Sequence, residues 1–171
     1  MSDAARYAVY FAPEAASAFW RFGCAWLGRD PETGAAPARP RLSEPVAADW
    51  DDASLGEITA SPGNYGFHAT LKPPFRLAVG RSLPELEAAA EAFAGQQRPF
   101  VCPNVRVAAL GRFIAFRLAT DSAGMQALAA AAVEHFDAFR APQSEAELAK
   151  RRGDGLSGRQ EALLRAWGYP Y

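Results

Sequence analysis

The sequence contains few residues of the kinds that bind metal ions or form disulfides. Its 171 residues include two cysteines, Cys24 and Cys102, and two histidines, His68 and His135. Neither cysteine belongs to a Cys-x-x-Cys pair, so no structural zinc site is encoded, and a disulfide has little support. No stretch reaches the ~18 apolar residues of a membrane span, and the first residues lack the apolar run of a signal peptide. We therefore expect a cytoplasmic protein that needs no metal or cofactor and has no membrane partner.

The sequence also has no excess of charge of either sign. The 18 lysines and arginines nearly balance the 19 aspartates and glutamates, and the formal net charge is −1. No overall field therefore recruits nucleic acid or an anionic membrane, and any recognition of phosphate must come from a local site. The sequence has no Gly-x-x-x-x-Gly-Lys-Ser/Thr loop, no His-Glu-x-x-His and no serine nucleophile elbow. These absences argue against the common nucleotide-binding, zinc-protease and serine-hydrolase classes.

Strand-like and helical patterns alternate along the chain. Residues 7–11 form a short β-type run, and a helical stripe of Phe19, Phe22 and Trp26 follows, closed by Gly28. Prolines and acidic residues then break every pattern between residues 28 and 64, which we interpret as a long loop or a partly mobile flap. The rest of the chain predicts strands at 65–78, 100–108 and 113–119, and helices at 82–95, 122–139, 144–152 and 157–167.

The helix boundaries have strong local signals. Ser82 is followed three residues later by Glu85, the spacing of a capping box, and serines open the later helices in the same way. Gly95 stands where a C-terminal cap belongs, and Gly111 lies between two strand-like runs that read as a hairpin. We predict an α+β fold with mainly antiparallel sheets flanked by helices.

The residues that could carry chemistry lie on the strand after the long loop. Side chains on a strand alternate between its faces, so His68, Thr70 and Lys72 are expected to share one face, with apolar residues on the other. An imidazole can move a proton near neutral pH, a hydroxyl can donate to a phosphate oxygen, and an ammonium can offset phosphoryl charge. The alternative is a half-exposed polar strand face with no catalytic task.

Residues 65–75 (YGFHATLKPPF) resemble the first histidine motif of the 2H phosphoesterase superfamily, and more closely the family encoded in bacterial phosphonate-utilisation operons. Residues 6–13, 136–142 and 167–171 support the resemblance. It implies one bilobal domain spanning 1–171, with a first lobe at roughly 1–98 that includes the loop 28–64, and a partial second lobe at roughly 99–171. It also implies a hydrolase that cleaves cyclic or linear phosphodiesters without metal, with His68 as general acid or base and Thr70 as phosphate donor.

The superfamily pattern also requires a second His-x-Thr/Ser motif, and this chain has none. His135 is followed by Phe136 and Asp137, and its helical position predicts a core or boundary histidine. We therefore expect an incomplete C-terminal lobe and poor catalysis by these 171 residues alone. Three interpretations stay open. The chain is a phosphoesterase, or it is a non-catalytic module that binds a phosphorylated ligand or a truncated fragment that lacks the second catalytic histidine, or it is a subunit whose partner completes the site.

Three further residues are weaker candidates for substrate binding. Lys72, Tyr65 and Arg117 could each reach a bound phosphate, although Tyr65 and Arg117 suit a solvated strand face equally well. The expected partner is a small phosphorylated metabolite or a cyclic phosphate, with nucleic acid limited to a small RNA-derived cyclic phosphate. The oligomeric state is not encoded in any pattern we can read.

Overall fold

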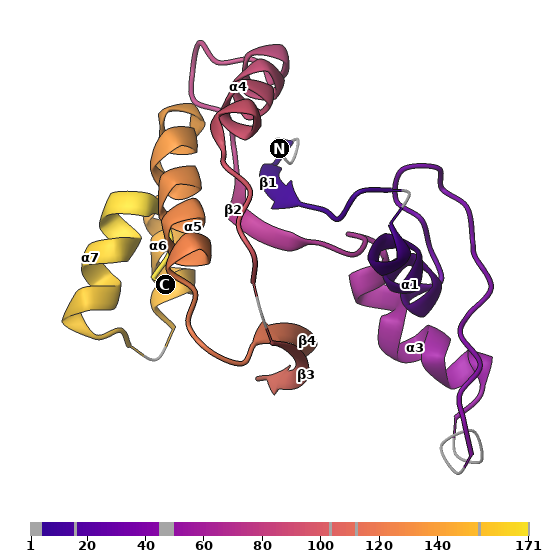
Figure 1. Ribbon diagram of the computed structural model, residues 1–171. Helices are drawn as coiled ribbons and strands as arrows, with labels where there is room; N and C mark the ends of the chain where they lie inside the picture. Colours follow the sequence, from indigo (N-terminus) through magenta and orange to yellow (C-terminus); the bar gives the residue numbers. More distant parts are fainter. Residues whose placement is uncertain are drawn as a thin grey trace. The chain divides into compact units, whose positions relative to one another are not determined.

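The computed structural model describes residues 5–15, 17–44, 50–102, 104–111, 113–153 and 155–170. Helices and short strands alternate along the chain, which confirms the α+β class (Figure 1). In chain order the elements are β1 (Tyr7–Phe11), α1 (Ala18–Leu27), α3 (Asp52–Gly63), β2 (Ala69–Phe75), α4 (Leu83–Gln96), β3 (Val105–Leu110), β4 (Phe113–Leu118), α5 (Ala123–His135), the 3₁₀ helix η1 (Phe136–Phe139), α6 (Glu145–Arg152) and α7 (Gly158–Trp167).

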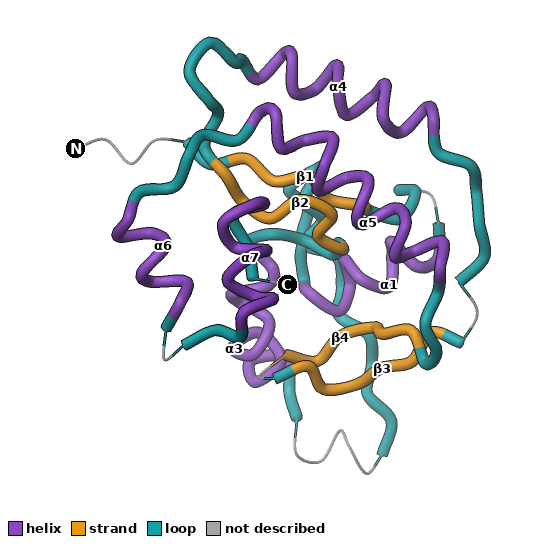
Figure 2. The backbone as a smooth tube through the Cα atoms, turned by 90° about the vertical axis from the view of Figure 1, so that its left-hand side faces the viewer, coloured by secondary structure: helices purple, strands orange, loops and turns teal. Residues whose placement is uncertain are grey.

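The strands form two separate two-stranded sheets. β1 pairs with β2, and β3 pairs with β4 in an antiparallel hairpin (Figure 2). β2 runs through Pro73 and Pro74 to Phe75, within the predicted strand of residues 65–78. A two-stranded sheet tolerates this because proline, which cannot donate a ladder hydrogen bond, can face a free edge.

The chain divides into two compact units. Unit 1 comprises the described parts of residues 1–9 and 71–171, and unit 2 comprises those of residues 10–70. β1 leaves unit 1 after Val9, and β2 enters it at Leu71. The predicted lobes, divided near residue 98, stay a prediction. No described helix has the length and apolar character needed to cross a membrane.

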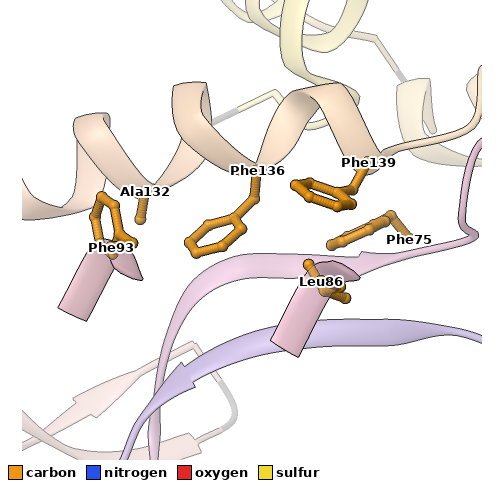
Figure 3. Packing of buried hydrophobic residues seen from close by; sticks show 6 residues of the cluster. All are labelled: Phe75, Leu86, Phe93, Ala132, Phe136 and Phe139. Atoms are coloured by element: carbon orange, nitrogen blue, oxygen red, sulfur yellow. The ribbon is translucent and has the colours of Figure 1, made fainter. Parts of the chain in front are cut away.

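The hydrophobic core of unit 1 lies between β2, α4 and the end of α5. Phe75 comes from β2, α4 contributes Leu86 and Phe93, and Ala132, Phe136 and Phe139 come from α5 and η1 (Figure 3). Ala132, Phe136 and Phe139 are all buried and form one inner face. The change from α-helix to 3₁₀ helix after His135 maintains that face, because side chains three residues apart eclipse one another in a 3₁₀ helix.

Most helix ends follow the local signals. Capping boxes open α4, α6 and α7 at Ser82, Ser144 and Ser157, as predicted. Gly28 closes α1 in the left-handed conformation, also as predicted. The expected cap at Gly95 is wrong, since α4 continues through it to Gln96. A capping serine exchanges hydrogen bonds with a residue three positions along, so the sequence shows both partners. A glycine near a helix end can also stay helical, so its presence alone does not mark the last turn.

Unit 2 corrects the prediction of a long loop over residues 28–64. Residues 52–63 of this stretch form helix α3, which begins after the Asp51 cap and packs against α1. The helix was missed because its apolar residues do not form a clear stripe and Pro62 lies in its last turn. α1 also differs from the prediction: Phe19 and Phe22 remain 42% and 46% exposed, and Trp20 is buried instead.

Two arginines attach the irregular stretch after α1 to both helices of unit 2. Arg29 donates to the carbonyl oxygens of Gly63 and Asn64 at the end of α3, at 3.2 and 3.0 Å. Arg39 donates to the Trp26 carbonyl at 2.7 Å and to Thr59 Oγ1 at 3.0 Å. Helix C-termini present unpaired carbonyls and negative partial charge, so a guanidinium satisfies both needs there. Residues 28–44 are therefore bound to the helices rather than forming a free flap.

Candidate active site around His68

His68 lies immediately before the first residue of β2, and the backbone just ahead of it fixes its ring. The imidazole Nδ1 lies 2.9 Å from the carbonyl oxygen of Gly66. Gly66 has a φ of +77°, and a Cβ built on it would lie 2.5 Å from Pro31 Cγ. Only glycine adopts this conformation freely and fits against the proline. The residue that supplies the carbonyl is therefore held in place by the left-handed turn and by the chain after α1.

The hydrogen bond to Gly66 decides which nitrogen of His68 can accept a proton. A carbonyl oxygen is only an acceptor, so the 2.9 Å contact assigns the proton of the neutral ring to Nδ1. Nε2 then carries the lone pair. An imidazole oriented by its other nitrogen in this way is the usual arrangement of a general base. The half-buried ring keeps access to solvent while its orientation is restricted.

Tyr10 of β1 restricts the plane of the same ring. The centroids of the Tyr10 and His68 rings lie 3.7 Å apart, with 23° between their planes. Next to His68 in sequence, Phe67 makes an edge contact with Phe19 at a centroid distance of 4.9 Å. Stacking and hydrogen bonding thus hold His68 from two directions. The sequence did not reveal Tyr10 as part of the site, because one strand's pattern does not identify the side chain lying across from it.

Thr70 and Tyr65 both lie in unit 2 with His68 and are accessible. Thr70 is the second residue of β2; its side chain is exposed, and its hydroxyl makes no hydrogen bond with any described residue. Tyr65 follows α3 and is 62% exposed. Thr70 can therefore donate to a ligand oxygen without breaking an existing contact. That His68 and Thr70 share one face stays a prediction, because His68 itself precedes the regular strand.

The expectation that Lys72 belongs to the same accessible row is wrong. Its side chain is fully buried in unit 1, and its Nζ donates to Asp137 Oδ1 at 2.7 Å and to the Val133 carbonyl at 2.8 Å. Burial lowers the pKa of Lys72 against the raising effect of Asp137. Burial opposes the charged form of Asp137 too, but hydrogen bonds from Arg140 and Lys72 outweigh it and lower that carboxyl's pKa. Lys72 is thus a structural cation, not an available phosphate ligand.

The other cation candidate and the second histidine lie in unit 1. Arg117 is exposed on β4. His135 forms the last residue of α5, where its ring packs against Phe93 and Phe136 with centroid distances of 5.2 and 4.9 Å. It is nevertheless exposed, so it is a boundary residue and not a core one.

The metal-ligating residue types and one glycine-rich segment bear on cofactor binding, and neither gives it support. Among the described residues, no group of three histidine, cysteine, aspartate or glutamate side chains could hold a metal ion, and both cysteines are free. Residues 153–158 (GDGLSG) match the spacing Gly-x-Gly-x-x-Gly in sequence. They join the end of α6 to the start of α7, whereas the dinucleotide-binding motif follows a strand. The spacing alone therefore has no supporting context.

Comparisons with known proteins place the chain in a family. It is 41% identical over 172 residues to ribose 1,5-bisphosphate phosphokinase PhnN of Janthinobacterium sp. (strain Marseille), covering 97% of this chain and 36% of that protein. A protein of the same name from Laribacter hongkongensis (strain HLHK9) is 39% identical over 168 residues, covering 97% of this chain and 37% of its own length. The chain thus spans little more than a third of these relatives. No solved structure matches it. Residues 70–171 match a family described as protein of unknown function (DUF1045), and the chain belongs to that family.

Proposed function

We propose that this chain is a metal-independent phosphoesterase whose proton acceptor is Nε2 of His68. The observation that carries the proposal is the hydrogen bond between His68 Nδ1 and the Gly66 carbonyl, which orients the ring and leaves Nε2 able to accept a proton. Thr70, exposed and without a described hydrogen-bond partner, is the proposed donor to a non-bridging phosphate oxygen. The resemblance of residues 65–75 to the 2H phosphoesterase motif supports the same two roles.

In the proposed reaction, water attacks the phosphorus of a cyclic phosphodiester while Nε2 of His68 takes the water's proton. The new P–O bond forms as one ester P–O bond breaks, and the departing alkoxide takes a proton from solvent. Thr70 offsets charge that gathers on the phosphoryl oxygens. The sequence supplies one histidine motif, so no second positioned acid protonates the leaving group, and a positioned acid is typically worth ~10²–10⁴-fold. We therefore expect slow turnover by these 171 residues.

The proposed substrate is a ribosyl phosphate or its cyclic form. Two relatives are named for ribose 1,5-bisphosphate, and the motif resemblance is to a family from phosphonate-utilisation operons. Together these support a role in phosphonate metabolism. The same two relatives are also named as kinases. This sequence lacks a Gly-x-x-x-x-Gly-Lys-Ser/Thr loop, so we attribute the named kinase activity to the part of those proteins outside the match.

A binding module is the second candidate, and the single histidine motif favours it. A chain with an oriented imidazole and an exposed hydroxyl, but one histidine motif, could hold a phosphorylated ligand without turning it over. Binding and turnover separate the two functions. A phosphoesterase releases a monoester from a 2′,3′-cyclic nucleotide or a ribosyl cyclic phosphate, whereas a binding module only retains it.

The experiment measures hydrolysis of both cyclic phosphates, with EDTA present, by wild type, His68→Ala and Thr70→Val. His68→Ala should lower kcat/KM by ~10²–10⁴-fold, and Thr70→Val by ~10²-fold. His135→Ala is the matched control, because this ring packs against Phe93 and Phe136 at the end of α5 and its removal should leave the rate unchanged. Equal rates for wild type and His68→Ala would contradict the mechanism. Activity abolished by EDTA and restored by zinc would contradict metal independence.

A further inference from the structure

The hairpin of β3 and β4 places two arginines directly opposite each other. Arg106 pairs with Arg117 in the antiparallel register, and both side chains are exposed. Because side chains alternate along each strand, the pair shares one face with two small residues, Ala108 and Ala115, which are paired two positions along. Opposed residues on a hairpin have Cβ atoms about 4.5–5.5 Å apart, so the two guanidinium groups can reach the same ligand.

Some arginines of unit 1 have carboxylate partners, which this pair lacks among the described residues. Arg76 binds Glu147 through two hydrogen bonds of 2.9 Å, and Arg152 binds Glu161 at 2.8 Å. Within the described part of the chain, neither Arg106 nor Arg117 has a hydrogen bond or an ion pair. Like charges directly opposite each other destabilise a hairpin. An anion bound between them would remove that repulsion.

We propose that Arg106 and Arg117 form a binding site for the phosphate group of a small phosphomonoester. A phosphomonoester carries −1.5 to −2 charges near neutral pH and three acceptor oxygens, which suits two planar guanidinium forks. The alanines beside the pair leave room for the rest of a small ligand. Two cations on a chain of net charge −1 do not make a nucleic-acid track. The proposal does not rest on the function proposed for His68, because it uses none of the residues that orient that ring.

Binding is tested on the full 171-residue chain by NMR titration with inorganic phosphate and with ribose 5-phosphate. Wild type should show saturable shifts at backbone amides of β3 and β4. Arg106→Gln/Arg117→Gln should raise Kd by at least about tenfold, the loss expected for charge-assisted hydrogen bonds. Arg98→Gln/Arg159→Gln is the matched control, because it removes two exposed arginines that have no partner among the described residues. Its Kd should equal that of wild type.

The charge of the ligand provides a second readout. Raising the pH from 5 to 8 gives phosphate its second negative charge while arginine stays protonated, so wild-type affinity should increase over this range. Phosphate should also raise Tm in wild type more than in Arg106→Gln/Arg117→Gln, since a ligand stabilises the state that binds it. Shifts confined to other elements, or equal Kd values for wild type and the double variant, would overturn the site.

The fold of the hairpin is checked by cross-strand NOEs between residues 106 and 117. If the double glutamine variant loses them, Arg106→Lys and Arg117→Lys replace it, because lysine retains the charge but not the bidentate fork. Each lysine variant should then bind phosphate more weakly than wild type. Unchanged binding in both would count against the proposal.

Discussion

The Nζ of Lys72 and the Oδ1 of Asp137 lie 2.7 Å apart, although the two residues are 65 positions apart in sequence. This ion pair joins β2 to the 3₁₀ helix η1, and Arg140 approaches the same carboxylate oxygen at 2.7 Å. The lysine side chain has no exposed surface, whereas 24% of the aspartate side chain remains exposed. The lysine therefore depends on its partner far more than the aspartate does.

We predict that Asp137→Asn destabilises the protein much more than Lys72→Met. The first variant leaves a buried ammonium without its counter-charge, which typically costs ~3–5 kcal/mol. The second replaces the lysine stem with an apolar chain of similar shape and leaves Asp137 paired with Arg140, so we expect a loss of ~1–2 kcal/mol. Urea unfolding at pH 7 measures both. Equal losses would show that the lysine is not the dependent partner.

We predict that Glu147 contributes to stability only above its folded pKa. Hydrogen bonds from the Ser144 backbone and from Arg76 lower the pKa of Glu147 from 4.5 to about 2. A lowered pKa means that the folded state favours the carboxylate. The contribution is therefore complete above pH 4.5 and is lost as the pH falls towards 2. Glu147→Gln retains an acceptor for the helix cap but removes the charge.

The measurement is Tm for wild type and Glu147→Gln between pH 2 and pH 6. Wild type should be more stable at pH 6, and the gap should close towards pH 2. Glu87→Gln, an exposed glutamate of α4 with no ion pair among the described residues, controls for the loss of one carboxylate. A gap that stays constant down to pH 2 would be inconsistent with the lowered pKa.

We predict that Gly66→Ala is more destabilising than Gly80→Ala. The φ angles are alike, at +77° and +81°, so alanine meets the same left-handed strain of ~1–2 kcal/mol at both positions. A Cβ at Gly66 also meets Pro31, whereas nothing lies within 4 Å of one at Gly80. Overpacking should add ~1–3 kcal/mol at Gly66 alone.

Denaturant midpoints give the two free energies, and the chemical shifts of the His68 ring report the site. Gly66→Ala should change those shifts, because the carbonyl that accepts from Nδ1 must move with the turn. Gly80→Ala should leave them unchanged. Ring shifts that respond equally to both substitutions would mean that the Gly66 turn does not hold the imidazole.

Features with short-range causes were predictable from the sequence. The capping boxes at Ser82, Ser144 and Ser157 involve partners three residues away, and the hairpin strands flank a turn at Gly111. The motif around His68 is equally local, and the carbonyl that orients its ring is two residues away. Such interactions depend on neighbouring backbone geometry and persist whichever way the elements pack.

Burial and pairing were decided only by the tertiary structure. Alternation along a strand groups side chains by face, but it does not tell which face another element covers. For this reason Lys72 was expected beside His68 and lies instead against α5, while Phe19 was expected inside and remains exposed. The stacking of Tyr10 on His68 and the facing of Arg106 and Arg117 likewise depend on strand pairing. The sequence by itself therefore determined which groups are available for chemistry. Packing between distant segments determined which of them meet, because each partner of these contacts is specified elsewhere in the chain.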